Sequence, residues 1–202
     1  MKKLLLSAFV ICLAGTSIAQ ESPLWMRHCA LSPDGTTIAF TYKGDIYTVP
    51  STGGRATQIT TNPAFDTEPV WGPDSKQIAF ASDRMGSLDV FVVSSEGGAP
   101  QRLTTHSGSE KPVAYKDNKH ILFTANIAPS AEDAGFPSGQ FQQVYEVAVT
   151  GGRPAMFSSM PMECISINKE GVMLYQDKKG YEDYWRKHQV SPIARDIWTY
   201  TP

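Results

Sequence analysis

Short runs of alternating apolar and polar residues cover most of this chain, and Gly, Pro, Asp and Asn stand between the runs. Apolar residues recur with a period of two in segments such as 38–40 and 46–49. This period, carried by β-branched and aromatic residues, is typical of β-strands in a packed sheet. The pattern therefore predicts an all-β protein built from many short strands.

The strand pattern is also repeated along the chain. The segment SPDGTTIAF at 32–40 returns about forty residues later as GPDSKQIAF at 72–80. Each copy continues with a second apolar alternation, a double glycine and a short segment that ends in Thr-Thr. This order predicts four short antiparallel strands in each repeat.

Four repeats can be aligned, at 27–61, 68–105, 111–157 and 163–202, and the last stops before its double glycine. One such sheet cannot bury its own apolar faces, whereas a radial stack of sheets can. We therefore predict a β-propeller with three complete four-stranded blades and an incomplete fourth. Propellers close with about 4–8 blades, so this fragment alone is expected to be poorly soluble or homo-oligomeric through an unpaired strand at 196–200.

Two sets of recurring aspartates are assigned to structure rather than to chemistry. One set lies in the turn between the first two strands, where Asp side chains bond to nearby backbone; its members are Asp34, Asp74 and Asp117. The other set marks the start of the third strand, where a carboxylate is expected to accept backbone or arginine hydrogen bonds; its members are Asp45, Asp89 and Asp196. Carboxylate metal ligands are the less favoured interpretation of both sets.

The first 19 residues resemble a secretory signal peptide. Lys2 and Lys3 precede an apolar run at 4–15, and the small-residue pattern before Gln20 predicts cleavage after Ala19. The run is too short to span a bilayer comfortably, and no second hydrophobic segment follows. The mature chain, 20–202, is expected to be exported and soluble, in a bacterial periplasm or secreted, with no membrane span.

Composition narrows the function classes further. The chain has 18 basic and 20 acidic residues, and cleavage removes two lysines, so no basic stripe is left for nucleic acid. The four histidines lack the spacing of metal ligands, and the sequence contains no known catalytic or phosphate-binding motif. We therefore predict no metal, no cofactor and no catalytic residue in this chain. An oxidising compartment permits a disulfide between Cys29 and Cys164, but corresponding positions of separate blades lie too far apart. Two buried free thiols are the preferred interpretation.

Several motifs together resemble a known family. SPDGTTIAF (32–40), SDRMGSLDVF (82–91) and GGAPQRLT (97–104) are similar to the Pro-Asp blade repeat of TolB-type and tricorn-type propellers. WMRHCALSPDG (25–35) resembles the first blade of periplasmic tricorn-like serine peptidases. Their fourth blade resembles YEDYWRKH (181–188) with ARDIW (194–198). The repeat covers nearly all of the mature chain and is more specific for the blade than for a function.

The resemblance implies a long enzyme with this N-terminal propeller, usually a second propeller, a PDZ domain and a C-terminal α/β serine-peptidase domain. The propeller would then be a peptide gate or binding platform, with peptides, protein segments and the remaining domains as partners. The catalytic residues of that family belong to the C-terminal part, so none is assigned here. The alternative is a TolB-like propeller without chemistry that binds proteins at the cell envelope. A propeller hydrolase or lyase is the least favoured class, because no carboxylate or histidine cluster supports it.

Unequal loops provide the candidate binding residues. The connections between the second and third strands, at 41–44, 81–88, 124–142 and 176–195, lengthen along the chain and leave one face of the propeller. Binding in repeat proteins often uses such loops. The last loop combines aromatic groups with cationic donors suited to carboxylates; the candidates are Tyr184, Trp185, Arg186, His188 and Arg195. The preferred alternative is that Trp185 packs inward as the core of its own loop.

Overall fold

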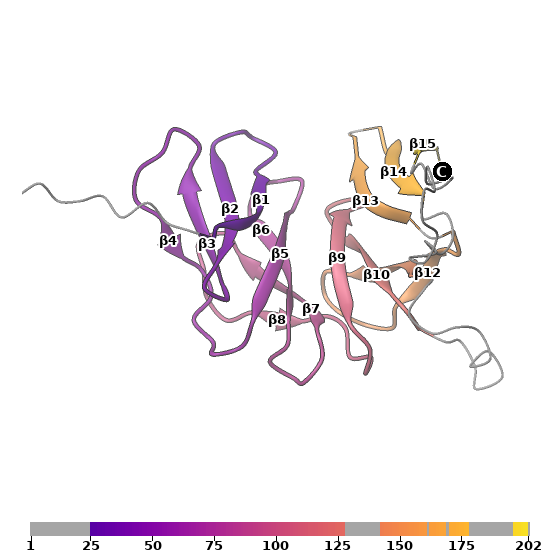
Figure 1. The fold of residues 1–202 in the computed structure, drawn as a ribbon, viewed down its shortest axis with the longest axis horizontal. Helices are drawn as coiled ribbons and strands as arrows, with labels where there is room; N and C mark the ends of the chain where they lie inside the picture. The colour runs from indigo at the N-terminus through magenta and orange to yellow at the C-terminus, as the bar shows by residue number, and fades with distance from the viewer. Residues whose placement is uncertain (1–24, 128–141, 161, 169, 178–195, 202) are drawn as a thin grey trace, which may run out of the picture.

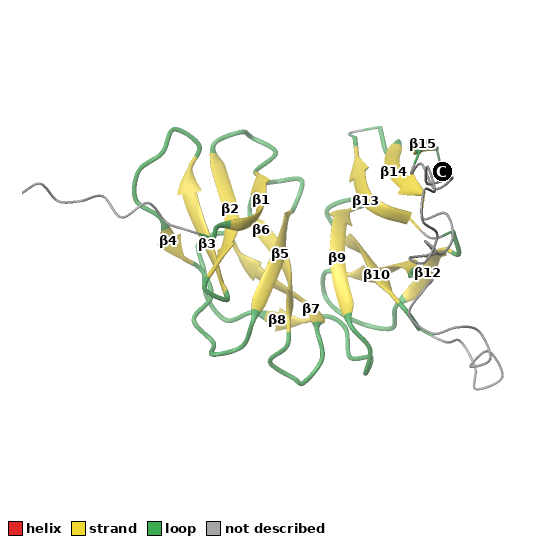
Figure 2. Ribbon diagram, in the orientation of Figure 1, coloured by secondary structure: helices red, strands yellow, loops and turns green. Residues whose placement is uncertain are grey.

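A computed structural model describes residues 25–127, 142–160, 162–168, 170–177 and 196–201 of the chain. Within these residues the only regular secondary structure is the β-strand (Figure 2), and none of the described chain forms a helix suited to crossing a bilayer. The strands form three four-stranded sheets and one three-stranded sheet, each antiparallel and each in sequence order. The predicted all-β propeller architecture is confirmed.

The strand bounds follow the repeat. The first sheet contains β1 (Arg27–Leu31), β2 (Thr37–Tyr42), β3 (Asp45–Pro50) and β4 (Thr57–Gln58). The second contains β5 (Asp66–Trp71), β6 (Gln77–Ser82), β7 (Asp89–Ser94) and β8 (Gln101–Arg102). The third contains β9 (Glu110–Tyr115), β10 (His120–Ala125), β11 (Gln143–Ala148) and β12 (Ala155–Ser158). The fourth contains β13 (Met162–Ile167), β14 (Met173–Asp177) and β15 (Ile197–Tyr200).

The sheets stack sideways, so that each covers an apolar face of the next (Figure 1). Ile46 of the first sheet packs in one buried cluster with Trp71 and Ile78 of the second. Equivalent clusters fill the second and third interfaces, around Phe123 and Met162 respectively. Apolar burial of this kind contributes about 25 cal/mol per Å². The sideways contacts therefore bury apolar faces that a single sheet would leave exposed, and they stabilise the fold.

One cross-strand aromatic pair recurs at the same place in three blades. Its ring centroids lie 5.9, 5.9 and 5.7 Å apart, and the pairs are Phe40–Tyr47, Phe80–Phe91 and Phe123–Tyr145. In these three blades the first strand carries a register shift opposite the phenylalanine of the second strand, that is Phe40, Phe80 or Phe123. In the fourth blade the shift lies opposite Tyr175. Such β-bulges re-aim side chains, and here they lie on the first strands of the blades, which contact one another from blade to blade.

The Pro-Asp-Gly turn forms as the sequence predicts. The Asp34 carboxylate accepts hydrogen bonds from the Ser32 hydroxyl at 2.6 Å and from the backbone N–H of Thr36 at 3.0 Å. Gly35 has a φ of 75°, a left-handed conformation that favours glycine. Asp74 and Asp117 accept equivalent backbone bonds from residues two positions later. These three aspartates are turn formers.

The prediction of two buried thiols is wrong in one respect. Cys29 and Cys164 are free, but both are exposed. Each lies in the bulge of its first strand, where two residues oppose a single partner, and Cys164 has a φ of 52°. The bulge interrupts the alternation of side chains between the two faces of the sheet. The two cysteine side chains therefore lie outside the apolar interface between blades.

The aspartates that begin the third strands differ in their partners. Asp89 pairs with Arg102 at 2.9 Å, as predicted for this position. Asp45 instead accepts from the Gln58 side chain at 2.9 Å and from the Thr60 hydroxyl at 3.3 Å. Both carboxylates tie the third strand of a blade to the segment that follows its double glycine. Their role is structural, as expected.

Candidate functional site

The five candidate binding residues of the last loop lie outside the described residues. They are Tyr184, Trp185, Arg186, His188 and Arg195. Most of the long connection at 124–142 also lies outside them. Binding by these loops therefore stays a prediction, and the described residues supply a different candidate.

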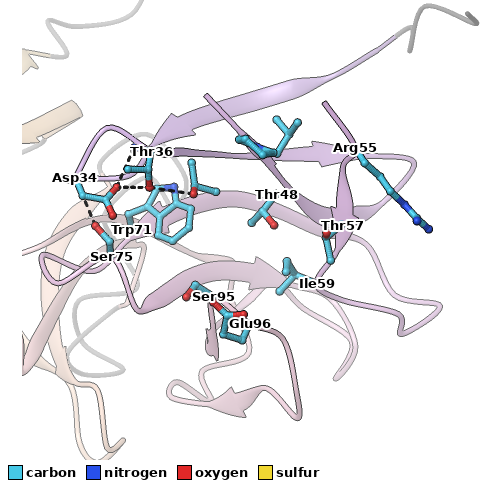
Figure 3. A pocket seen from close by; sticks show the side chains of 13 residues that line it. Asp34, Thr36, Thr48, Arg55, Thr57, Ile59, Trp71, Ser75, Ser95 and Glu96 are labelled. Atoms are coloured by element: carbon cyan, nitrogen blue, oxygen red, sulfur yellow. Dashed lines mark hydrogen bonds between the residues drawn. The ribbon is translucent and has the colours of Figure 1, made fainter. Parts of the chain in front are cut away.

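This candidate is a groove between the first and second blades (Figure 3). Its volume is about 400 Å³, within the range of about 300–1,000 Å³ found for ligand pockets. The turn between β1 and β2 and the segment from β3 to β4 form one wall, and the turns after β5 and β7 form the other. These turns lie at the opposite end of the blades from the place where each second strand ends and each third strand begins, because strands alternate in direction within each blade.

The groove has a polar lining above an apolar floor. Ile59 and Trp71 form part of the floor, and both are buried in the cluster between the blades. Thr48 and Thr57, which are directly opposite each other on β3 and β4, line one side, and Ser95 lines the other. Among the described residues, the hydroxyl groups of these three make no hydrogen bond. They are therefore available to a ligand.

Charged groups lie around this lining. Asp34 lies at one end of the groove and Arg55 at the other, with Glu96 on the wall of the second blade (Figure 3). Hydrogen bonds from the hydroxyl of Ser32 and from Thr36 lower the pKa of Asp34, so its carboxylate is already engaged. Neither Arg55 nor Glu96 makes an ion pair within the described part of the chain. Arg55 is thus the cation that the groove can offer.

The corresponding corner between the second and third blades is closed. Val92 takes the place of Thr48, and Val149 takes the place of Ser95; both pack in the apolar cluster of that interface. The Gln101 side chain, at the position of Thr57, donates a hydrogen bond to the Thr150 carbonyl across the gap at 3.0 Å. The same scaffold therefore supports a filled corner, and the first interface departs from it at positions 48, 57 and 95, among others.

The first strands of the blades form a second polar surface, along the axis. β1 contacts β5, β5 contacts β9, and β9 contacts β13. The Lys111 ammonium pairs with the Glu68 carboxylate at 2.7 Å and joins two neighbouring blades. Glu68 has a φ of 55° in the bulge of β5. This half-buried pair braces the axial wall rather than presenting a free charge.

Buried carboxylates stand at the other end of the blade interfaces. Asp66 is fully buried and receives two hydrogen bonds of 3.0 Å from one Arg84 nitrogen. Glu110, at the corresponding place in the third blade, is also fully buried. Ile127 stands where Arg84 would be, so Glu110 has no such arginine.

The environment of Glu110 opposes its charge. Neither of its oxygens makes a hydrogen bond of good geometry within the described residues. Burial raises the pKa of Glu110, and the nearby Asp89 carboxylate raises it further. The hydroxyl of Thr104 and the backbone of His106 offset part of this rise. No group of three or more metal-ligating side chains occurs in the parts of the chain that the structure describes.

Reasoning from the sequence missed the groove. The repeats resemble one another closely, and no histidine, cysteine or catalytic motif lines this site. A position-by-position comparison of the blades would have found it. Threonine and serine stand at positions 48 and 95 where the next interface carries valine, and polar residues at an apolar repeat position are informative.

Fold and groove together define a β-propeller with a polar cleft between two blades, an architecture suited to binding. The chain matches the tricorn protease N-terminal β-propeller domain over residues 23–202. It belongs to this family.

Individual relatives agree with the assignment. The chain is 38% identical over 77 residues to tricorn protease homolog 1 of Streptomyces coelicolor, covering 38% of this chain and 7% of the relative. It is 31% identical over 108 residues to the uncharacterized peptidase YuxL of Bacillus subtilis, covering 48% of this chain and 16% of that protein. The matches thus span only a small part of these curated relatives.

Solved structures share the fold. Putative TolB from Agrobacterium tumefaciens superposes with a TM-score of 0.58 and 24% identity, over 74% of this chain and 55% of that one. The tricorn protease superposes with a TM-score of 0.55 and 14% identity, over 77% of this chain and 19% of that one. At these identities the likeness supports the propeller fold alone.

Proposed function

We propose that this chain is the N-terminal propeller part of an exported tricorn-like serine protease. In this role it binds or admits peptides for a peptidase domain that lies outside the chain. The single observation that carries the proposal is the family match, which covers nearly the whole chain after the leader-like segment. A curated relative named as a tricorn protease homolog supports it.

The proposal assigns the propeller a binding role and no step of peptide-bond cleavage. Propellers place binding on loops and clefts that a rigid scaffold positions. The blade interfaces here are such a scaffold, because apolar clusters pack all three of them. Export rests on the resemblance of residues 1–19 to a signal peptide.

The experiment uses the full-length protein, expressed with its natural N-terminus. A fluorophosphonate probe, which labels activated serines covalently, is expected to label the protein and to stop hydrolysis of an unstructured peptide of about 20 residues. N-terminal sequencing of the exported product is expected to begin at Gln20. A well-folded full-length protein that is neither labelled nor hydrolytic would overturn the assignment and favour the TolB-like alternative.

The gating role needs its own test. If Trp185 contacts the substrate rather than packing as the core of its own loop, Trp185→Ala slows turnover of the long peptide and leaves turnover of a dipeptide reporter unchanged, since only a long substrate meets the propeller. Equal slowing of both substrates, or a lower melting temperature with turnover per folded molecule unchanged, would show that Trp185 serves the fold or the chemistry and not the gate.

A further inference from the structure

We propose that the groove between the first and second blades binds a short extended peptide, with a carboxylate of that peptide paired to Arg55. This inference deepens the proposed function, because it rests on a propeller that handles peptides. It places a contact at the end of the blades where the first strand turns into the second and the third into the fourth.

The internal comparison of blade interfaces is the first support. Val92 and Val149 fill the corner between the second and third blades, and the hydrogen bond from Gln101 bridges it. The corner between the first two blades carries Thr48 and Ser95 instead, and about 400 Å³ stays open. The same fold can fill this corner with apolar side chains, as the next interface shows. Packing alone therefore does not explain why the first corner stays open.

The chemistry of the lining indicates a peptide backbone. A hydroxyl group both donates and accepts hydrogen bonds, so Thr48, Thr57 and Ser95 can serve the alternating N–H and C=O groups of an extended chain. These three hydroxyls have no partner among the described residues. Thr48 is only 8% exposed, so a ligand that reaches it must enter the groove.

A sugar ligand fits the groove less well. Recognition of a sugar ring would need the open face of an aromatic side chain as a platform. Trp71 is only 7% exposed, and its indole N–H already donates a hydrogen bond to the Ala30 carbonyl at 2.9 Å. The indole is therefore part of the floor rather than a stacking surface.

Charge selects the kind of peptide. Arg55 is exposed and makes no ion pair within the described chain, and a guanidinium group pairs well with a carboxylate. The groove also carries two carboxylates of its own. Asp34 at the far end is held by its own turn, and Glu96 on the wall of the second blade makes no ion pair within the described chain, so the carboxylate of the peptide is expected at the Arg55 end. The carboxylate that meets Arg55 can come from an acidic side chain or from the C-terminus of the peptide.

The test measures fluorescence anisotropy of labelled heptapeptides of glycine and serine with the full-length protein. One peptide has a central glutamate and an amidated C-terminus, a second has glutamine instead, and a third has glutamine with a free C-terminal carboxylate. The first or the third, or both, are expected to bind more tightly than the second. Which of the two binds identifies the source of the carboxylate.

Two variants locate the site. Arg55→Ala is expected to weaken binding of the acidic peptide about tenfold, whereas Arg153→Ala, at the same place in the third blade, leaves it unchanged. The triple variant T48V/T57Q/S95V gives the first corner the side chains of the second. It is expected to fold, because the next interface carries these side chains, and to abolish binding. The single variant Ser95→Val, with a smaller loss, provides a check that does not depend on the triple variant folding.

Retained binding by the folded triple variant overturns the inference, as does an equal effect of Arg55→Ala and Arg153→Ala. Tetrasaccharides of glucose and of N-acetylglucosamine are tested in the same assay, and their binding in place of peptides also overturns it. Fluorophosphonate labelling is followed in the same samples. Labelling with no groove binding contradicts this inference alone, and absence of labelling contradicts the proposed function.

Discussion

The indole N–H of Trp71 donates a hydrogen bond of 2.9 Å to the backbone carbonyl of Ala30 in the neighbouring blade. Tyr115 occupies the corresponding position in the third blade, and its ring lies about as deeply buried against the second blade. Its hydroxyl, however, has no hydrogen-bond partner among the described residues. The polar group of one aromatic residue is thus hydrogen-bonded and that of its equivalent is not. Removing the two groups is therefore expected to have opposite effects on stability.

Trp71→Phe is expected to lower the free energy of unfolding by about 2 kcal/mol. The loss combines one buried hydrogen bond, about 1 kcal/mol, with the volume left by the larger ring. Urea denaturation followed by circular dichroism measures it. The matched control is Trp25→Phe at an exposed position, where less than about 0.5 kcal/mol is expected; equal losses would mean that the bond to Ala30 contributes nothing.

Tyr115→Phe is expected to leave the free energy of unfolding unchanged or to raise it by up to about 1 kcal/mol. Removing a buried hydroxyl without a partner, at constant ring shape, relieves a desolvation cost. The same burial raises the pKa of Tyr115 well above its usual value. A loss above about 1 kcal/mol in urea denaturation would show that the hydroxyl does have a partner.

Asp66→Asn is expected to cost about 3 kcal/mol, because it leaves the largely buried Arg84 without its counter-charge. Thermal melts of the wild-type and variant proteins measure the loss. Lys116→Ala is the control: it removes the partner of Glu146 from an ion pair that is more than one quarter exposed on both sides, where at most about 1 kcal/mol is expected. A cost for Asp66→Asn no larger than that of the control would refute a stabilising role for the buried pair.

Much of the fold could be predicted from the sequence, because its determinants are local and repeated. The turn chemistry of Asp34 and Gly35 fixes the first hairpin, and the recurring apolar alternation fixes which faces are buried. The bulges were not predictable in this way. They interrupt the alternation without a distinctive residue type, since His28, Glu68 and Cys164 all adopt a positive φ there.

The groove was predictable only by treating the repeats as controls for one another. Thr48 and Ser95 are ordinary surface residues in isolation, and they become informative only against Val92 and Val149 at the same positions. The missing partner of Glu110 has the same character. The second blade has a carboxylate, Asp66, at the same position, and its partner Arg84 lies two residues after the second strand. In the third blade Ile127 takes the place of this arginine.

Glu110→Gln is expected to stabilise the protein at neutral pH and to have little effect in acid. Burial raises the pKa of Glu110 above its ordinary value near 4.5, so the folded state binds this proton more tightly than the unfolded state does. The resulting stability is complete below about pH 4.5 and is lost as the pH rises through the raised pKa. Glutamine keeps the shape of the protonated acid and does not ionise.

Melting temperatures of wild-type and variant proteins between about pH 4 and pH 8 measure this difference. The difference between the two melting temperatures is expected to grow as the pH rises. The lowered pKa values of Asp34 and Asp117 change stability with pH in the opposite direction. Both proteins contain these residues, so their effect cancels in the difference. Glu170→Gln, at an exposed turn position, is the control and should give parallel curves. If Glu110→Gln lowered the melting temperature equally at every pH, the carboxylate would have to be ionised and well solvated or paired, contrary to its buried position beside Asp89.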